Sequence, residues 1–270
     1  MTEKKIGIIG CGNMGEALLS RLSGLIEKSA SLMVSEEDAK RRGYIQTKYK
    51  IIVQIDNNAV VKYCDVIILA VKPDDFDSVL KQEVCRGISD KKLLISIAAG
   101  VTTKYIEKAV GADIPVIRAM PNMGAIIGES ITSISKGSSA AKSDMDTARE
   151  IFETIGDVVE VDEKLVDAVT AISGSGPAYF FYLIEALIEA AGELGLDPET
   201  AKRLVTKTAT GSARLLEELK EDPESLRKRV ASKGGTTEAA LKIFEKKAVK
   251  RVIKDAVKAA HKRSKELARR

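Results

Sequence analysis

The chain has 270 residues, of which 44% are hydrophobic and 30% are charged. Domains usually hold about 100–200 residues, so this length predicts two domains. The 43 basic and 39 acidic side chains leave a formal net charge of +4, which argues against a dedicated nucleic-acid surface. Three cysteines lack metal-ligand spacing and suit a reducing compartment, and we expect no metal site.

The first residues lead directly into a short apolar segment and show no signal-peptide pattern. No uninterrupted apolar run approaches the roughly 20 residues that span a bilayer. We therefore expect a cytoplasmic protein without a membrane partner.

The first half alternates short apolar runs with helical patterns, which is typical of βαβ units. The runs at 66–70 and 93–97 lack polar alternation, as expected of strands covered by helices on both faces. We predict an α/β fold with a doubly wound parallel sheet. Its expected strands lie at 5–9, 32–34, 66–70, 93–97, 116–119, 130–135 and 158–161.

Strand signals stop after Glu163, and helices are predicted over residues 177–194, 198–218, 224–231 and 237–269. We therefore place an α/β domain at residues 1–163 and an all-helical domain at residues 164–270. The alanine-rich, apolar helices of the second domain favour pairing with a second copy. We predict at least a homodimer.

The strongest motif, Gly10-Cys11-Gly12-Asn13-Met14-Gly15, follows a strand and opens a helix. In that setting a G-x-G-x-x-G pattern indicates a Rossmann-type dinucleotide-binding domain. Gly10 permits the tight turn, Gly12 lets the backbone approach a pyrophosphate, and Gly15 lets the helix pack closely on the sheet. The pyrophosphate is expected at the helix N-terminus, where unpaired N–H groups favour an anion.

The second strand ends at Ser35 and Glu36, where the adenosine ribose should lie. Glu36 favours NADH, because its carboxylate accepts hydrogen bonds from a free 2′-hydroxyl. Ser35 with Lys40, Arg41 and Arg42 instead favours the 2′-phosphate of NADPH. Both cofactors remain open at this point.

Two further strands end in small or polar residues, and ligands of open α/β sheets bind beyond the carboxyl ends of strands. These segments are Ala70-Val71-Lys72-Pro73 and Ala98-Ala99-Gly100, and both are expected near the nicotinamide. The small side chains of Ala98 and Ala99 leave room for a flat ring. Lys72 precedes a proline and is more typical of a surface residue than of a catalytic acid.

A second cluster, Ser232-Lys233-Gly234-Gly235-Thr236-Thr237-Glu238, opens the last predicted helix. Paired glycines, hydroxyls and a helix N-terminus form a nest of N–H donors suited to a carboxylate. The same residues also fit an ordinary turn in which Thr236 or Thr237 caps the helix. The residue chemistry leaves both interpretations open.

Taken together, these segments resemble pyrroline-5-carboxylate reductases, continuously from about Ile6 to Phe244. The resemblance rests on Gly174-Ser175-Gly176-Pro177-Ala178-Tyr179, Ser232 with Gly234-Gly235-Thr236-Thr237, Arg118-Ala119-Met120-Pro121-Asn122, Ala70-Val71-Lys72-Pro73 and the glycine motif. It implies reduction of 1-pyrroline-5-carboxylate to L-proline by NADPH or NADH, the last step of proline biosynthesis. It also implies dimers that often assemble into larger rings.

The resemblance further assigns residues to the site. Asn57, Val71 and Lys72 would contact the nucleotide, with Met120, Pro121 and Asn122 as further cofactor-binding candidates, and Glu163 would lie near the substrate. The hydroxyl of Thr237 would bond the ring nitrogen as the catalytic group, while the N–H groups of Gly235, Thr236 and Thr237 hold the carboxylate. Ser232 and Gly234 are further substrate-binding candidates.

Two positions depart from the family pattern. Lys233 stands where members commonly have proline, and Glu36 stands where relatives often carry serine, asparagine or arginine. The second departure weakens the family's usual preference for NADPH. Alternative functions are a related two-domain reductase of another cyclic imine or a hydroxy acid, and a non-catalytic sensor of nicotinamide redox state.

Overall fold

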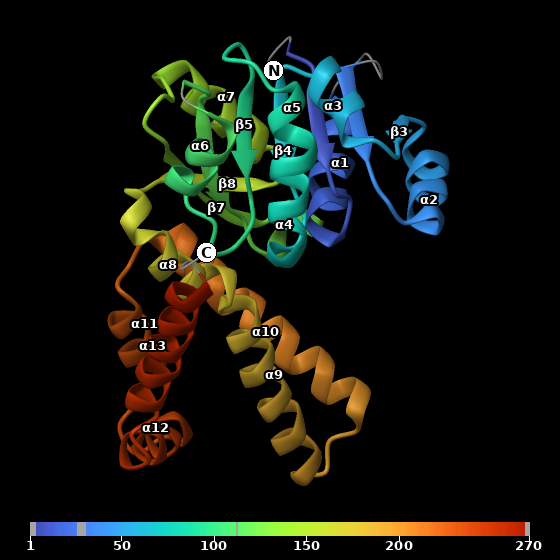
Figure 1. Ribbon diagram of the computed structural model, residues 1–270. Helices are drawn as coiled ribbons and strands as arrows, with labels where there is room; N and C mark the ends of the chain where they lie inside the picture. Colours follow the sequence, from blue (N-terminus) through green and yellow to red (C-terminus); the bar gives the residue numbers. More distant parts are fainter. Residues whose placement is uncertain (1–3, 26–30, 112, 268–270) are drawn as a thin grey trace. The chain divides into compact units, whose positions relative to one another are not determined.

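The computed structural model describes residues 4–25, 31–111 and 113–267. Within these ranges an eight-stranded sheet runs in the order β3-β2-β1-β4-β5-β6-β7-β8 (Figure 1). The strands are β1 (Ile6–Ile9), β2 (Leu32–Ser35), β3 (Ile52–Gln54), β4 (Val66–Leu69), β5 (Leu93–Ser96), β6 (Val116–Met120), β7 (Ser130–Lys136) and β8 (Gly156–Glu160). The first six are parallel, whereas β7 runs antiparallel to β6 and β8 follows the direction of β7.

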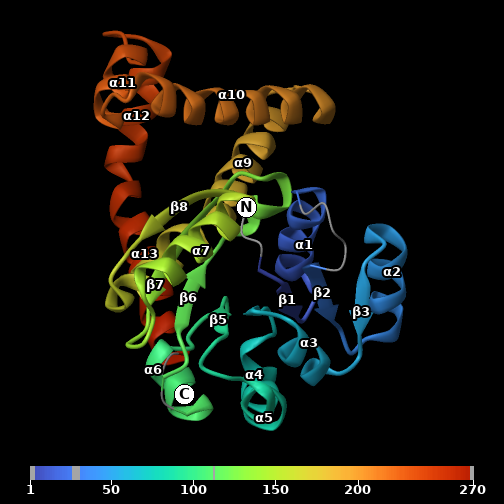
Figure 2. The same ribbon diagram turned by 90° about the horizontal axis from the view of Figure 1, so that it is seen from above.

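Helices cover both faces of this sheet, as Figure 2 shows. Successive strand residues point to opposite faces, so Ile8 and Ile68 join one buried core while Ile67 and Leu69 join the other. On the first face lie α1 (Asn13–Leu25), α2 (Ala39–Tyr49) and α7 (Lys142–Glu153); on the second lie α3 (Asn57–Tyr63), α4 (Pro73–Val79), η2 (Leu80–Val84) and α6 (Thr103–Val110). The short α5 (Cys85–Gly87) follows η2, and η3 (Met123–Ile127) follows β6.

All seven predicted strands are present, with ends that agree within two residues. The strand β3 was not predicted, because it is a three-residue, partly exposed edge strand without a continuous apolar run. The predicted doubly wound parallel sheet is confirmed for β1 to β6, and β7 and β8 extend it in the opposite direction. The short connection through η3 returns the chain antiparallel beside β6, whereas a parallel return needs a longer crossover.

From Glu163 to Leu267 the described chain is helical, as predicted. The elements are η4 (Glu163–Leu165), α8 (Val166–Val169), η5 (Thr170–Gly174), α9 (Gly176–Glu193), α10 (Pro198–Leu219), α11 (Pro223–Val230), α12 (Thr236–Lys246) and α13 (Val249–Leu267). The single helix predicted over 237–269 is therefore two helices, and its last two residues lie outside the described ranges. Ala248 adopts a left-handed conformation (φ 52°) that ends α12, without a glycine to mark it.

The chain forms two compact units, and the domain boundary at residue 163 stays a prediction. One contains residues up to 175 together with residues from 260 onward, and the other contains residues 176–259. Residues 163–175 belong to the sheet unit because Glu163 binds Thr103 at the start of α6. The end of α13 joins the same unit through a 2.8 Å hydrogen bond from Ser264 to Asp167.

In the helical unit, α9 and α10 lie side by side and are joined by a turn through Gly195, whose φ is 92° (Figure 1). Asp197 caps α10 by accepting from the Thr200 N–H at 3.0 Å, and Pro198 occupies its first turn, as predicted. Large apolar side chains of α9 are 45–75% exposed in the single chain, namely Phe180, Phe181, Tyr182, Leu183 and Leu187. A surface this apolar marks an interaction face.

By length and composition alone, one continuous helical stretch, Glu163–Glu193, is apolar enough to cross a membrane, and 11% of its most apolar window is buried. The carboxylates of Asp167, Glu185 and Glu189 interrupt this stretch. The absence of a membrane partner therefore stays a prediction.

Close packing of α3 on β1 depends on Gly7. A Cβ atom there would lie 2.3 Å from Val60 Cγ1 and 2.9 Å from Cys64 Sγ. We expect Gly7→Ala to lower the free energy of unfolding by about 1–3 kcal/mol, because the buried side chains must shift to admit the methyl group. Urea unfolding followed by circular dichroism measures this change.

The matched control is Gly43→Ala on α2, where a new Cβ would meet nothing within 4 Å. We expect this substitution to raise stability by about 0.5–1 kcal/mol, because alanine restricts the unfolded chain and favours the helix. A Gly7→Ala protein as stable as Gly43→Ala would contradict this account of the packing.

Candidate functional site

The glycine loop between β1 and α1 has the geometry that its three glycines predict. Gly10 has a φ of 85°, and a Cβ there would lie 2.9 Å from the Ala70 carbonyl oxygen. A Cβ on Gly15 would lie 2.4 Å from the Gly10 carbonyl oxygen. Around Gly12 a Cβ would meet nothing within 4 Å, so the backbone there is open to a ligand.

A cavity of about 560 Å³ lies at this loop, beside residues that follow β1, β2 and β4. Its size is within the usual range of small-molecule and cofactor sites. Nine predicted cofactor residues line it: Gly10, Gly12, Asn13, Ser35, Glu36, Asn57, Ala70, Val71 and Lys72. An open loop, a helix N-terminus and a cavity at the strand ends together fit a dinucleotide.

The remaining predicted cofactor residues do not line this cavity: Met14, Gly15, Pro73, Ala98, Ala99, Met120, Pro121 and Asn122. Met14 packs against the sheet core, and Pro73 begins α4. Asn122 caps η3, where its side-chain oxygen accepts from the Gly124 N–H at 3.0 Å. Met120 lies against Gly174, whose Cβ would come within 2.9 Å of the Met120 Cε. Their cofactor roles stay predictions.

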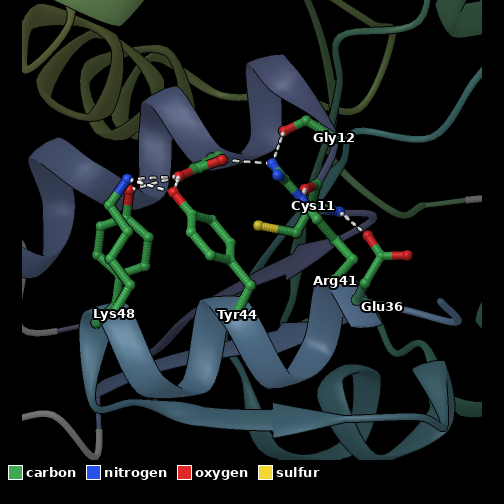
Figure 3. Close-up of polar contacts among 8 residues, drawn as sticks. Cys11, Gly12, Glu36, Arg41, Tyr44 and Lys48 are labelled. Atoms are coloured by element: carbon green, nitrogen blue, oxygen red, sulfur yellow. Dashed lines mark hydrogen bonds and ion pairs between the residues drawn. The ribbon is translucent and has the colours of Figure 1, made fainter. Parts of the chain in front are cut away.

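The carboxylate of Glu36 is fixed at the glycine loop. Its Oε2 accepts from the Cys11 N–H at 2.9 Å (Figure 3). Its Oε1 accepts from the Asp38 N–H at 3.1 Å. The neighbouring Ser35 also lines the cavity and is fully buried, and its hydroxyl has no hydrogen-bond partner among the described residues. Glu36 follows β2 directly and contributes a carboxylate to the cavity wall.

Arg41 of α2 spans the same loop from the other side (Figure 3). Its Nε donates to the Cys11 carbonyl at 2.8 Å, and its guanidinium forms an ion pair with Glu16 on α1. Arg42 turns elsewhere, since it donates to the backbone carbonyls of Glu36 at 2.9 Å and Glu37 at 2.6 Å. Both arginines are thus engaged within the protein.

Glu16 is the centre of a cluster that sequence reasoning missed. Its carboxylate accepts from Lys48 at 2.9 Å, Tyr49 at 2.9 Å and Tyr44 at 3.1 Å, in addition to Arg41. Burial raises the pKa of Glu16, but these hydrogen bonds and the charge of Arg41 outweigh it and hold the pKa at about 2. The available signal was an acidic residue in the first turn of the motif helix.

Cys11 lies within the glycine loop but is not a reactive thiol. It is fully buried, and burial raises its pKa to about 12 despite the nearby charge of Arg41. The thiol is therefore neutral near pH 7, whereas nucleophiles and metal ligands are thiolates. Within the described ranges no group of three or more His, Cys, Asp or Glu side chains is arranged to hold a metal ion.

The turn at residues 232–237 forms the N-terminus of α12. Gly235 is its N-cap residue, and no side chain caps the helix, so Thr236 and Thr237 occupy the first turn instead of capping it. Gly234 has a φ of 74° and donates its N–H to the carboxylate of Glu238 at 2.6 Å. Of the three predicted donors, the Gly235 N–H is already bonded to the Ser232 carbonyl at 3.0 Å.

This turn already binds one carboxylate, that of Glu238. The Gly234 N–H, followed by the charge of Lys242, lowers the pKa of Glu238 below its usual range. An uncapped helix start also leaves first-turn N–H groups for a ligand. The nest interpretation therefore fits this geometry better than a cap made by Thr236 or Thr237.

Glu163, predicted near the substrate, is held by protein groups. Its two oxygens accept from the N–H and the hydroxyl of Thr103 at 2.7 and 2.6 Å. The buried Arg118 lies 3.5 Å from it and 3.7 Å from Asp167. These contacts fix η4 and α8 on the sheet unit, and a substrate role for Glu163 stays a prediction.

Two family models match separate parts of the chain, and full-length relatives match nearly all of it. Residues 163–267 match the family model for pyrroline-5-carboxylate reductase dimerisation, and residues 5–100 match the model for NADP oxidoreductase, coenzyme F420-dependent. The pyrroline-5-carboxylate reductase of Synechocystis sp. is 40% identical over 98% of this chain and 99% of its own. Pyrroline-5-carboxylate reductase 2 of Bacillus subtilis is 38% identical over 98% of this chain and 95% of its own.

Solved structures of pyrroline-5-carboxylate reductases have a fold similar to that of this chain. The Plasmodium falciparum pyrroline carboxylate reductase with NADP bound has a TM-score of 0.90 and 32% identity, covering 99% of both chains. A pyrroline-5-carboxylate reductase from Coxiella burnetii has a TM-score of 0.91 and 33% identity, covering 100% of both chains.

The Glu16 cluster makes the free energy of unfolding depend on pH. Because the pKa of Glu16 is lowered in the folded protein, its contribution is complete above the usual carboxyl pKa of about 4.5 and is lost as the pH falls towards 2. We expect Glu16→Gln to lower the free energy of unfolding by about 1–3 kcal/mol at pH 7. Urea unfolding of both proteins from pH 7 to pH 2 measures the difference.

The difference between the two proteins should shrink between pH 4.5 and 2, because wild-type Glu16 then becomes neutral like glutamine. A difference that stays constant over this range would show that charge does not hold the cluster together.

Proposed function

The chain belongs to the pyrroline-5-carboxylate reductase family, and we propose that its glycine-loop cavity holds the dinucleotide while the turn at residues 232–237 holds the substrate. The reaction is the reduction of 1-pyrroline-5-carboxylate to L-proline by NADH or NADPH, the last step of proline biosynthesis. The observation that carries this function is the 40% identity to a curated reductase over 98% of the chain.

The sheet unit is proposed to bind and orient the cofactor. The open backbone at Gly12 and the start of α1 at Asn13 would receive the pyrophosphate, and Ala70 to Lys72 would line the path beyond β4. Bound there, a reduced nicotinamide supplies the hydride for the imine carbon. The protein would hold the nicotinamide in one orientation, because hydride transfer requires the nicotinamide carbon and the imine carbon in near contact.

The turn at residues 232–237 is proposed to bind the substrate's two polar groups. The uncapped first-turn N–H groups of Thr236 and Thr237 would hold the carboxylate, with Ser232 beside them. The Thr237 hydroxyl would bond the ring nitrogen, since a hydroxyl donates to an imine and accepts from the N–H of the iminium or amine. The imine takes its proton from solvent in this scheme.

The helical region supports a homodimer, because residues 163–267 match the family's dimerisation model. We propose that the exposed apolar side chains of α9 are covered by a second copy and that dimers assemble further into a ring. A dimer interface also accounts for the apolar character of the stretch Glu163–Glu193 without a membrane. A cytoplasmic location is part of this proposal.

Substrate turnover tests the function directly. With purified protein, we expect loss of NADH or NADPH absorbance that depends on 1-pyrroline-5-carboxylate and yields proline. Thr237→Val, which removes the hydroxyl but keeps the side-chain shape, should lower kcat/KM for the imine by about 10–100-fold. Thr237→Ser, which keeps the hydroxyl, should retain most of the wild-type kcat/KM.

Fluorescence titration with NADH serves as the control, because Thr237→Val should leave cofactor affinity intact. Thr236→Val provides the positional comparison and should cost less, since the proposal uses the backbone of Thr236 and not its hydroxyl. A Thr237→Val enzyme within about twofold of wild-type kcat/KM would remove the catalytic role.

Dimerisation through α9 can be tested by placing a charged side chain on its apolar surface. Leu187 is 45% exposed in the single chain, and burying a carboxylate at its position would be costly. We expect Leu187→Glu to raise the dimer dissociation constant by at least about 100-fold in sedimentation velocity. Ile52→Glu, at a 43% exposed apolar position on β3, is the control and should remain dimeric. Equal dimer affinity for both variants would place the interface elsewhere.

A further inference from the structure

We propose that this chain selects NADH over NADPH, because the Glu36 carboxylate occupies the place of a 2′-phosphate and the nearby arginines are committed to other partners. The inference rests on the proposed cofactor cavity and adds the choice of cofactor, which the family does not decide.

Glu36 stands where the adenosine ribose is read, at the carboxyl end of β2 and in the wall of the cavity. Its orientation is not free, because each carboxylate oxygen accepts a backbone N–H, from Cys11 at 2.9 Å and from Asp38 at 3.1 Å. A carboxylate has about four acceptor positions, so two remain for ligand hydroxyls. A ribose diol can donate to them, whereas a phosphate in the same place has no hydrogen to donate and repels the charge.

A 2′-phosphate bound here would need a cation. Arg41 lines the cavity, but its guanidinium bonds the Cys11 carbonyl and pairs with Glu16. Moving Arg41 to a phosphate would leave Glu16, which is 17% exposed, with fewer partners. Arg42 is bonded to the carbonyls of Glu36 and Glu37, and Lys40 is exposed on α2 and does not line the cavity.

The other charged residues around the cavity also favour NADH over NADPH. Glu37 and Asp38 follow Glu36 in its wall, so three successive carboxylates surround the ribose end. Lys72 also lines the cavity, but it follows β4, which β1 separates from β2 in the sheet. Asp75 accompanies Lys72 on that wall. The ribose end therefore presents acidic groups and a single, already paired cation.

The family does not dictate this outcome, since its member from Plasmodium falciparum was solved with NADP bound. The selecting features belong to this chain: an acidic residue at position 36 that is fixed by the loop it faces, and an arginine held by Glu16.

The experiment measures binding to the intact protein by isothermal titration calorimetry, without substrate or turnover. The ligands are NAD⁺ and NADP⁺, and the pair 5′-AMP and 2′,5′-ADP, which isolates the adenosine half. Wild-type protein should bind NAD⁺ about 100-fold more tightly than NADP⁺, because like charges brought together cost several kcal/mol.

Glu36→Gln keeps an oxygen that accepts the Cys11 N–H while removing the charge. We expect it to reduce the preference for NAD⁺ by at least about tenfold, chiefly through tighter binding of NADP⁺ and 2′,5′-ADP. Glu36→Ser should shift the preference in the same direction. Glu150→Gln on α7 removes the same charge from an exposed position outside the cavity and should leave the wild-type preference unchanged.

Three outcomes would overturn the inference. Wild-type protein could bind NADP⁺ as tightly as NAD⁺, Glu36→Gln could leave the ratio unchanged, or Arg41→Gln could weaken NADP⁺ selectively in a protein that prefers it. The last result would mean that Arg41 leaves Glu16 to hold the phosphate. Binding of neither dinucleotide by folded protein would instead remove the proposed cofactor cavity, and the inference with it.

Discussion

The close approach of α1 to the sheet is the constraint on which the cofactor site depends. At Gly10 and Gly15 a Cβ atom would lie 2.9 and 2.4 Å from backbone carbonyl oxygens, so any larger residue would push the helix away. With the helix in place, the backbone at Gly12 faces open space and the first turn of α1 faces the cavity. The loop also comes within hydrogen-bond reach of Glu36 and Arg41, the two residues on which the proposed choice of cofactor rests.

Charge distribution around that loop follows from one ion cluster. Glu16 pairs with Arg41 and Lys48, which ties the first turn of α1 to α2 and engages the arginine that lines the cavity. In the proposed scheme this ion pair also affects the choice of cofactor, since a 2′-phosphate would have to compete with Glu16 for Arg41. An arginine near a ribose site therefore indicates phosphate binding only when its guanidinium is not already paired with another group.

The helical unit differs from the sheet unit, because much of its apolar surface is not buried within one chain. Phe180 and Tyr182 of α9 are 68% and 75% exposed, which accords with the dimerisation model matched by this region. At α12 an uncapped N-terminus and a positive-φ glycine present backbone donors, and Glu238 already uses one of them. We propose that these exposed features serve binding, that of a second copy at α9 and that of a substrate carboxylate at α12.

Local patterns in the sequence determined the seven main strands, the helical second half, the glycine loop and the glycine turn before the helix at 236, because periodicity and glycine spacing act over a few residues. Tertiary structure alone decided the reversal at β7, the break at Ala248 and the attachment of residues 163–175 to the sheet unit. It also decided what Glu36, Arg41 and Glu163 bind, since their partners are 25, 25 and 60 residues away in the chain. Such pairings depend on how distant elements pack, and no short-range pattern records them.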